Sequence, residues 1–231
     1  MRALLWKDYR ANQPVLFVGA VLLVAPYLVV VGWHWSTADL LPTRAADWAQ
    51  SLFTAAHASL IASQLTIVLL AGNVIAGERR DRSAEFLAYL PPSRPAILAS
   101  KSILCAATVI VIWGVSLVIV GLVVPGLDAD VVSGSNREKL LDFVAMVAAL
   151  GAALFGGAWL GSSMLESPTY STAIGFFSVV LVLFLLNTCH HMTGWPDYDE
   201  AFVHWLRLLY AGVGAAGFVV GWTSYVRRVE P

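Results

Sequence analysis

Six long apolar segments constrain the fold of this chain more than any other feature. Polar stretches separate these segments, which cover about residues 14–33, 51–76, 97–124, 140–164, 169–187 and 201–226. A helix rises 1.5 Å per residue, so about 20 apolar residues cross the roughly 30 Å of hydrocarbon in a bilayer. Each segment is therefore long enough to span a membrane, and together they leave no room for a folded soluble domain.

The composition agrees with a membrane protein. Of the 231 residues, 58% are hydrophobic and 13% are charged, whereas soluble domains carry about 25% charged residues. So few charges cannot cover a water-facing surface. The net charge of −1 indicates no nucleic-acid partner. We predict one all-α integral membrane domain over residues 1–231, with six transmembrane helices.

Basic residues predict the orientation of the chain. Residues 1–13, residues 77–101 and the C-terminal tail hold three, five and two of the 14 Lys and Arg residues, and the opposite loops hold the other four. An excess of Lys and Arg marks the cytoplasmic face of a membrane protein. We therefore expect both termini in the cytoplasm. Residues 1–13 are predicted to form a helix on the membrane surface, with Leu5, Trp6 and Tyr9 on its apolar face.

The polar break between the second and third spans has a distinct pattern. It reads GERRDRSAEFLAYLPPSRPAILASK from Gly77 to Lys101. Within it Phe86, Leu87 and Leu90 share one face of a short helix, and the prolines that follow would end that helix. Such a helix suits contact with another protein. A solvated loop, or a helix lying on lipid headgroups, fits the local pattern as well.

Polar residues also occur inside the spans. In the second span Ser59, Ser63, Thr66 and Asn73 form one stripe, and Asn187 ends the fifth. Such residues either line a pathway or form hydrogen bonds with a neighbouring helix. Small residues at G-x-x-x-G spacing occur twice, at 157–161 and 217–221, and this spacing lets two helix backbones approach closely.

Motifs for chemistry within the chain are missing from the sequence. It has no G-x-x-x-x-G-K-[ST] phosphate loop, and no H-E-x-x-H, G-x-S-x-G or C-x-x-C pattern. Ionisable residues deep within the spans are scarce, which argues against coupling to protons. Energy for any transport is therefore expected to enter from elsewhere.

One cluster suggests an alternative with metal chemistry. Cys189, His190, His191 and Met192 carry the thiolate, imidazole and thioether groups that soft copper prefers. Four consecutive residues do not easily face one ion, however, so we predict no metal site. A membrane-embedded enzyme or copper-handling protein that uses residues 189–204 remains the alternative.

The polar break resembles the membrane subunit of type 2 ABC transporters, the ABC exporter permease family. The residues that carry the resemblance are Gly77, Glu78, Glu85, Phe86, Leu87, Leu90, Pro91, Ser93 and Arg94. The opening Leu4–Arg10 also resembles the surface helix that begins many such permeases.

The resemblance implies a role for the segment 77–96. It would be a coupling helix that sits in a groove of a cytoplasmic ATPase, with the turn at Glu166 as a second, smaller contact. The residues implied in docking are Glu78, Arg79, Arg82, Glu85, Phe86, Leu87, Leu90 and Arg94.

The resemblance also implies an assembly. The chain would be a non-catalytic permease subunit in a bacterial inner membrane, and it would act as an exporter. It would pair with an identical or homologous permease and with two ATPase subunits, which would bind the ATP and Mg, so that this chain needs no cofactor. A scaffold that anchors an ATPase without transport is the remaining rival. The sequence does not distinguish lipid-like, peptide and antibiotic cargoes.

Overall fold

In the computed structural model, almost all of the described residues are α-helical. The described residues are 2–37, 45–80, 93–123, 134–193 and 200–227. The middle of the polar break, residues 81–92, which we call the polar segment, lies outside the described residues, and so do the site predictions made for Arg82, Glu85, Phe86, Leu87 and Leu90.

Within the described ranges, six helices are long and apolar enough to cross a membrane. A short helix, α1 (Arg2–Ala11), precedes them. The six are α2 (Gln13–Thr37), α3 (Ala45–Arg80), α5 (Arg94–Val123), α6 (Gly134–Met164), α7 (Pro168–Thr193) and α8 (Glu200–Arg227). The predicted all-α class and the six membrane-length helices are confirmed.

Several helices extend beyond the predicted spans. The apolar pattern places boundaries at residues 51, 76, 140 and 187, whereas α3 runs from Ala45 to Arg80, α6 begins at Gly134 and α7 ends at Thr193. Hydropathy marks where a chain crosses hydrocarbon, but helical backbone hydrogen bonds continue among polar residues until a cap or breaker ends them. Parts of the predicted polar connections are therefore helical.

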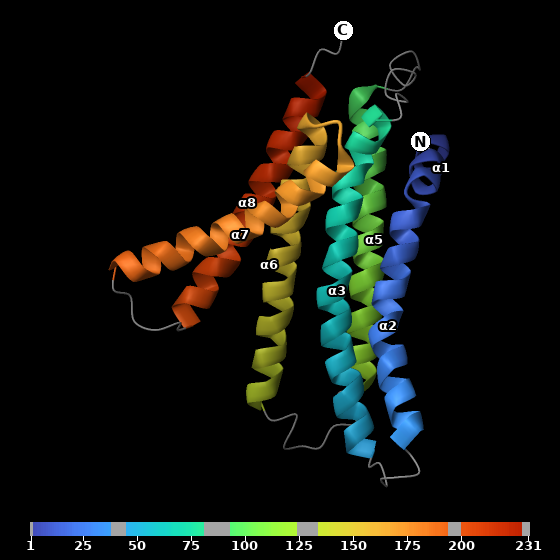
Figure 1. Ribbon diagram of the computed structural model, residues 1–231, viewed down its shortest axis with the longest axis vertical. Helices are drawn as coiled ribbons and strands as arrows, with labels where there is room; N and C mark the ends of the chain where they lie inside the picture. The colour runs from blue at the N-terminus through green and yellow to red at the C-terminus, as the bar shows by residue number, and fades with distance from the viewer. Residues whose placement is uncertain (1, 38–44, 81–92, 124–133, 194–199, 228–231) are drawn as a thin grey trace.

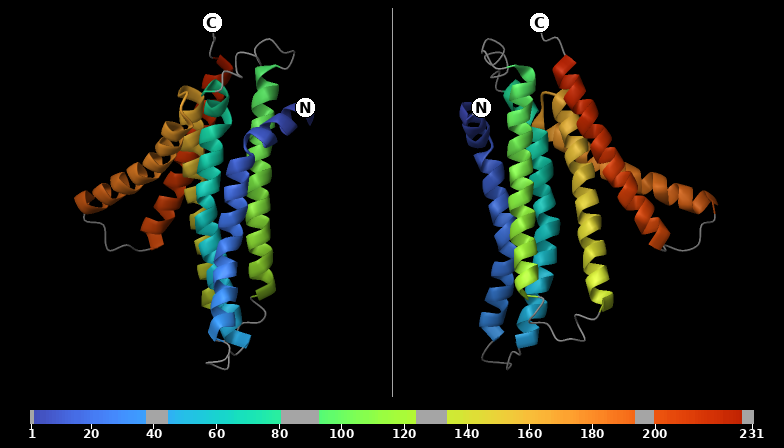
Figure 2. Two further views of the ribbon diagram at one scale, coloured as in Figure 1. Left: turned by 45° about the vertical axis from the view of Figure 1, so that its right-hand side comes forward. Right: turned by 180° about the vertical axis from the view of Figure 1, so that it is seen from behind.

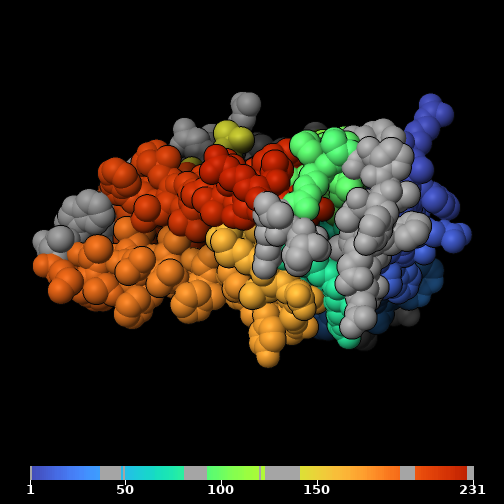
Figure 3. Space-filling view, turned by 90° about the horizontal axis from the view of Figure 1, so that it is seen from above, coloured from blue at the N-terminus to red at the C-terminus, as the bar shows by residue number. Residues whose placement is uncertain are grey.

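The helices form two groups. In Figures 1 and 2, α2, α3 and α5 run side by side, α6 runs next to α3, and α7 and α8 lean away from the others. Helix α1 and the end of α8 lie at the same end of the molecule (Figure 1), as an even number of spans requires. Viewed from this end, α7 and α8 reach out on one side and α1 and α2 lie on the other (Figure 3).

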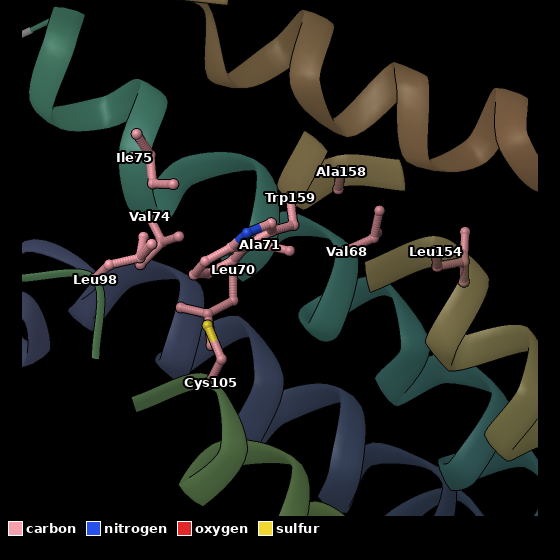
Figure 4. Packing of buried hydrophobic residues seen from close by; sticks show 10 residues of the cluster. All are labelled: Val68, Leu70, Ala71, Val74, Ile75, Leu98, Cys105, Leu154, Ala158 and Trp159. Carbon is pink, nitrogen blue, oxygen red and sulfur yellow. The ribbon is translucent and has the colours of Figure 1, made fainter. Parts of the chain in front are cut away.

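Helix α3 is the centre of the bundle. In the most apolar stretch of its span 67% of the residues are buried, against 11% for α2 and 17% for α5. Its inner face meets side chains of α5 and α6 in one cluster, made of Val68, Leu70, Ala71, Val74, Ile75, Leu98, Cys105, Leu154, Ala158 and Trp159 (Figure 4). The fully buried Trp159 contacts the aromatic ring of Phe218, with centroids 5.2 Å apart, and so joins α8 to the cluster.

Glycines set the distance between α6 and its neighbours. A Cβ atom on Gly161 would lie 2.9 Å from the Cα of Ser171 on α7, and one on Gly217 would lie 2.6 Å from the carbonyl oxygen of Gly156. Both predicted G-x-x-x-G motifs are thus at close helix contacts. The closest approach is one that the motif search missed, because a Cβ on Gly156 would lie 2.1 Å from the carbonyl oxygen of Gly214.

We expect Gly156→Ala to destabilise the protein by about 1–3 kcal/mol, since the added methyl group forces α6 and α8 apart. Gly114→Ala is the matched control, because a Cβ on Gly114 in α5 meets nothing within 4 Å. The midpoint of thermal unfolding in detergent measures both variants. An unchanged midpoint for Gly156→Ala would contradict the close backbone contact.

Candidate functional site

A buried lysine joins three helices at the end of the molecule where α1 lies. Lys101 is only 1% exposed, although it lies in the first turns of α5. Its Nζ atom is 2.9 Å from Glu78 Oε2 and 3.4 Å from Asp8 Oδ1. It also donates a hydrogen bond of 2.6 Å to the carbonyl oxygen of Val74. Oxygen atoms from α1 and α3 therefore surround the ammonium group.

Lys7 completes a group that we call the four-charge cluster: Lys7, Asp8, Glu78 and Lys101. Lys7 Nζ donates to Glu78 Oε1 and lies 3.7 Å from Asp8 Oδ1. Two positive and two negative groups balance each other. A buried charge is tolerated when it is paired in this way.

Hydrogen bonds extend the cluster along both sides of α1. Asp8 is 2% exposed, and its Oδ2 accepts a hydrogen bond of 2.5 Å from Ser100 Oγ. The side-chain amide of Asn12 donates to the carbonyl oxygen of Asp8 at 2.8 Å, and Asn73 donates to Asn12 Oδ1 at 2.9 Å. Helix α1 is thus held to both α3 and α5.

The last turns of α3 are also held by α6. The backbone amides of Ile75 and Ala76 donate to Ser162 Oγ, at 3.1 and 2.9 Å. The carbonyl oxygen of Val74, one residue earlier, accepts a hydrogen bond from Lys101 Nζ. The end of α3, from which the polar segment departs, is therefore tied to α5 by a charged ammonium group and to α6 by one neutral hydroxyl group, which is the weaker contact.

The predicted docking residues that the structure describes lie in different surroundings. Glu78 is 9% exposed and belongs to the four-charge cluster. Arg79 and Arg94 are half-buried at the two ends of the polar segment, whereas Glu166 is exposed in the short connection between α6 and α7.

A family model described as an ABC-2 family transporter protein matches residues 6–184. The chain belongs to this ABC-2 family of membrane transport proteins. The match covers most of the chain, including the four-charge cluster and the polar segment, and it confirms the resemblance seen in the sequence. No curated protein and no solved structure matches the chain significantly.

Family membership defines this ABC-2 protein coarsely. It is a multi-pass membrane protein of a transporter family whose members are transport subunits rather than catalysts. The four-charge cluster shows how the polar segment is attached to the membrane-length helices. The family name does not state this.

Sequence reasoning missed Lys101 and Asp8 as site residues. It counted Lys101 among the basic residues of a polar loop, but Lys101 lies inside α5 and is shielded from solvent. The predicted surface helix placed Trp6 and Tyr9 on an apolar face, and both are exposed, but the prediction gave no role to Asp8, which is buried on the other side of α1. An ionisable residue within a membrane helix indicates a buried partner, and that signal was available at Lys101.

The polar stripe of α3 in this ABC-2 protein forms hydrogen bonds inside the chain. Ser59 Oγ donates to the carbonyl oxygen of Leu23 on α2 at 2.9 Å, and Ser63 Oγ donates to Leu60 of its own helix. Thr66 is fully buried. These contacts support the hydrogen-bonding alternative for the stripe, and a pathway-lining role for Ser59, Ser63, Thr66, Asn73 and Asn187 stays a prediction. Asn187 does not join the stripe, since the end of α7 leans away from α3 (Figures 1 and 2).

The alternative metal cluster gains no support. Among the described residues no three His, Cys, Asp or Glu side chains gather as a metal site. Cys189 and Met192 are exposed, and His190 is buried with its ring 5.6 Å from that of Phe202.

We expect Lys101→Met to destabilise the ABC-2 protein by about 3–5 kcal/mol, because it removes the fully buried ammonium group between Asp8 and Glu78 and water cannot replace it there. Lys7→Met should cost less, since the Lys7 side chain is 35% exposed, so water screens its charge and solvent can partly replace it. Thermal unfolding in detergent, monitored by size-exclusion chromatography, compares the midpoints of the two variants. Equal losses would contradict the central place of Lys101.

Proposed function

We propose that this ABC-2 chain is a permease subunit that couples to a separate cytoplasmic ATPase through the polar segment between α3 and α5. The observation that carries the proposal is the contact between Glu78 and Lys101, 2.9 Å apart. These residues flank the segment on its two sides, and both pair with α1 through Lys7 and Asp8. The segment therefore departs from a unit of three joined helices.

Such an attachment suits the transmission of force. A movement of residues 81–92 reaches α3 through Arg80 and α5 through Ser93. Separating these helices would break a buried ion pair, which costs several kcal/mol. The low-cost response is a joint movement of α1, α3 and α5, and this movement would re-pack the spans around a pathway. ATP can drive the change only through its different affinity for the two arrangements.

The proposed docking surface has two parts. Phe86, Leu87 and Leu90 provide apolar contacts, while the basic residues around Arg80 orient the ATPase electrostatically. The exposed turn at Glu166 provides the second contact.

The complete assembly follows from the same proposal. Two ATPase subunits bind ATP and Mg, and two permease chains, identical or homologous, enclose the pathway. Both termini and the polar segment face the cytoplasm of a bacterial cell, and the direction of transport is export. The basic residues concentrated in residues 1–13 and 77–101 support this orientation.

The double variant Leu87→Asp, Leu90→Asp tests the docking role. We expect membrane insertion to be unchanged and the ATPase to be lost from the complex purified in mild detergent, because the two carboxylates remove the apolar contact. Val131→Asp with Val132→Asp is the matched control, since it places the same charges in the polar connection between α5 and α6. Co-purification of an ATPase with the first double variant would refute the docking role.

A further inference from the structure

The central helix carries a buried amide in the middle of its span. Gln64 of α3 is 3% exposed. Its Nε2 atom donates a hydrogen bond of 2.9 Å to the carbonyl oxygen of Leu60, whereas its Oε1 atom has no hydrogen-bond partner among the described residues. A buried acceptor without a partner is rare and costly in a protein interior.

The orientation of this amide is fixed by its own hydrogen bond. Rotating the side-chain amide of Gln64 by half a turn would set Oε1 against the carbonyl oxygen of Leu60, and two acceptors repel each other. The carbonyl group of the side chain must therefore point away from α3. Gly151 of α6 leaves the space for it, because a Cβ atom there would lie 2.3 Å from Oε1.

Gln64 lines a cavity of about 350 Å³ between α3, α5 and α6. Its size is typical of small-molecule sites. Figure 2 shows α5 and α6 on either side of α3 when the molecule is viewed from behind. The other lining side chains are apolar, and the larger ones are Ile67, Val109, Trp113 and Phe155.

The walls of the cavity come from three helices of membrane-spanning length, so in a bilayer we expect hydrocarbon around it. Water is scarce there, and a polar solute would have to leave water to enter. An apolar chain dissolved in the bilayer meets no such cost. An unpaired carbonyl oxygen in the wall favours, among apolar molecules, those that bring one hydrogen-bond donor.

We propose that the cavity between α5 and α6 binds a lipid-like molecule that carries a single hydroxyl donor and enters sideways from the bilayer. The apolar chain lies against Val109, Trp113 and Phe155, and the hydroxyl donates to Gln64 Oε1. The site needs neither the ATPase nor the polar segment, so it stands apart from the proposed coupling role.

A second cavity serves as the internal comparison. It has about 290 Å³, lies between α2, α3 and α5, and is lined by Thr66, whose buried Oγ1 also has no hydrogen-bond partner among the described residues. A threonine hydroxyl can rotate and donate to a carbonyl of its own helix, so it needs no ligand. Gln64 has no such freedom, because its Oε1 atom can only accept a hydrogen bond and the hydrogen bond from Nε2 to Leu60 holds the amide in place.

The test uses two photoactivatable probes in liposomes that contain the full chain. One is an undecanol with a diazirine at the end of its chain, and the other is the methyl ether of the same molecule, which cannot donate a hydrogen bond. We expect the alcohol to label peptides around Trp113 and residues 148–155 about fivefold more than the ether, as one added neutral hydrogen bond implies.

Variants assign that difference to the amide. Gln64→Leu should lower labelling by the alcohol to the level of the ether, whereas Thr66→Val should leave it unchanged. Equal labelling by the two probes in the unaltered protein would overturn the proposal, and this comparison needs no variant to fold. Labelling that avoids α5 and α6 altogether, as when a second copy of the chain covers the cavity, would overturn it too.

Discussion

The rest of the structure depends on an ammonium group that is sealed among α1, α3 and α5. An unpaired charge away from water is very costly, and two carboxylates and a backbone carbonyl oxygen offset that cost at Lys101. Because the carboxylates belong to α1 and α3, the pairing holds three helices at one spacing. Helix α1 is therefore a packed part of the bundle, although Trp6 and Tyr9 remain exposed on its outer side as interfacial aromatic residues do.

Two kinds of packing complete the bundle around this unit. On one side, charges and hydrogen bonds join α1 to α3 and α5. On the other, glycines allow α6 to approach α7 and α8 closely, and α6 reaches back to the end of α3 through Ser162. The cavity beside Gln64 lies where these two sides meet. Helix α3 thus takes part in the charge cluster, the apolar core and the cavity.

The sequence predicted the features that depend on local patterns. Runs of about 20 apolar residues located the six spans, and the Gly157–Gly161 and Gly217–Gly221 motifs marked close helix contacts. The apolar pattern does not locate the helix ends, because helical hydrogen bonding continues past the apolar residues, as at Gly134 and Thr193. The charge cluster was missed for another reason: Asp8 and Lys101 lie 93 residues apart, and nothing in the local pattern of either residue specifies its partner.

The most direct test of this account measures whether α1 and α3, two of the three joined helices, move together. Nitroxide labels at Ala11→Cys on α1 and Arg80→Cys on α3, with Cys189→Ser, place probes at exposed positions of two joined helices. A second pair joins Arg80→Cys to Glu166→Cys. In the complex with its ATPase, we predict that ATP leaves the distance from residue 11 to residue 80 unchanged and alters the distance from residue 80 to residue 166. A nucleotide-dependent change between residues 11 and 80 would contradict the account.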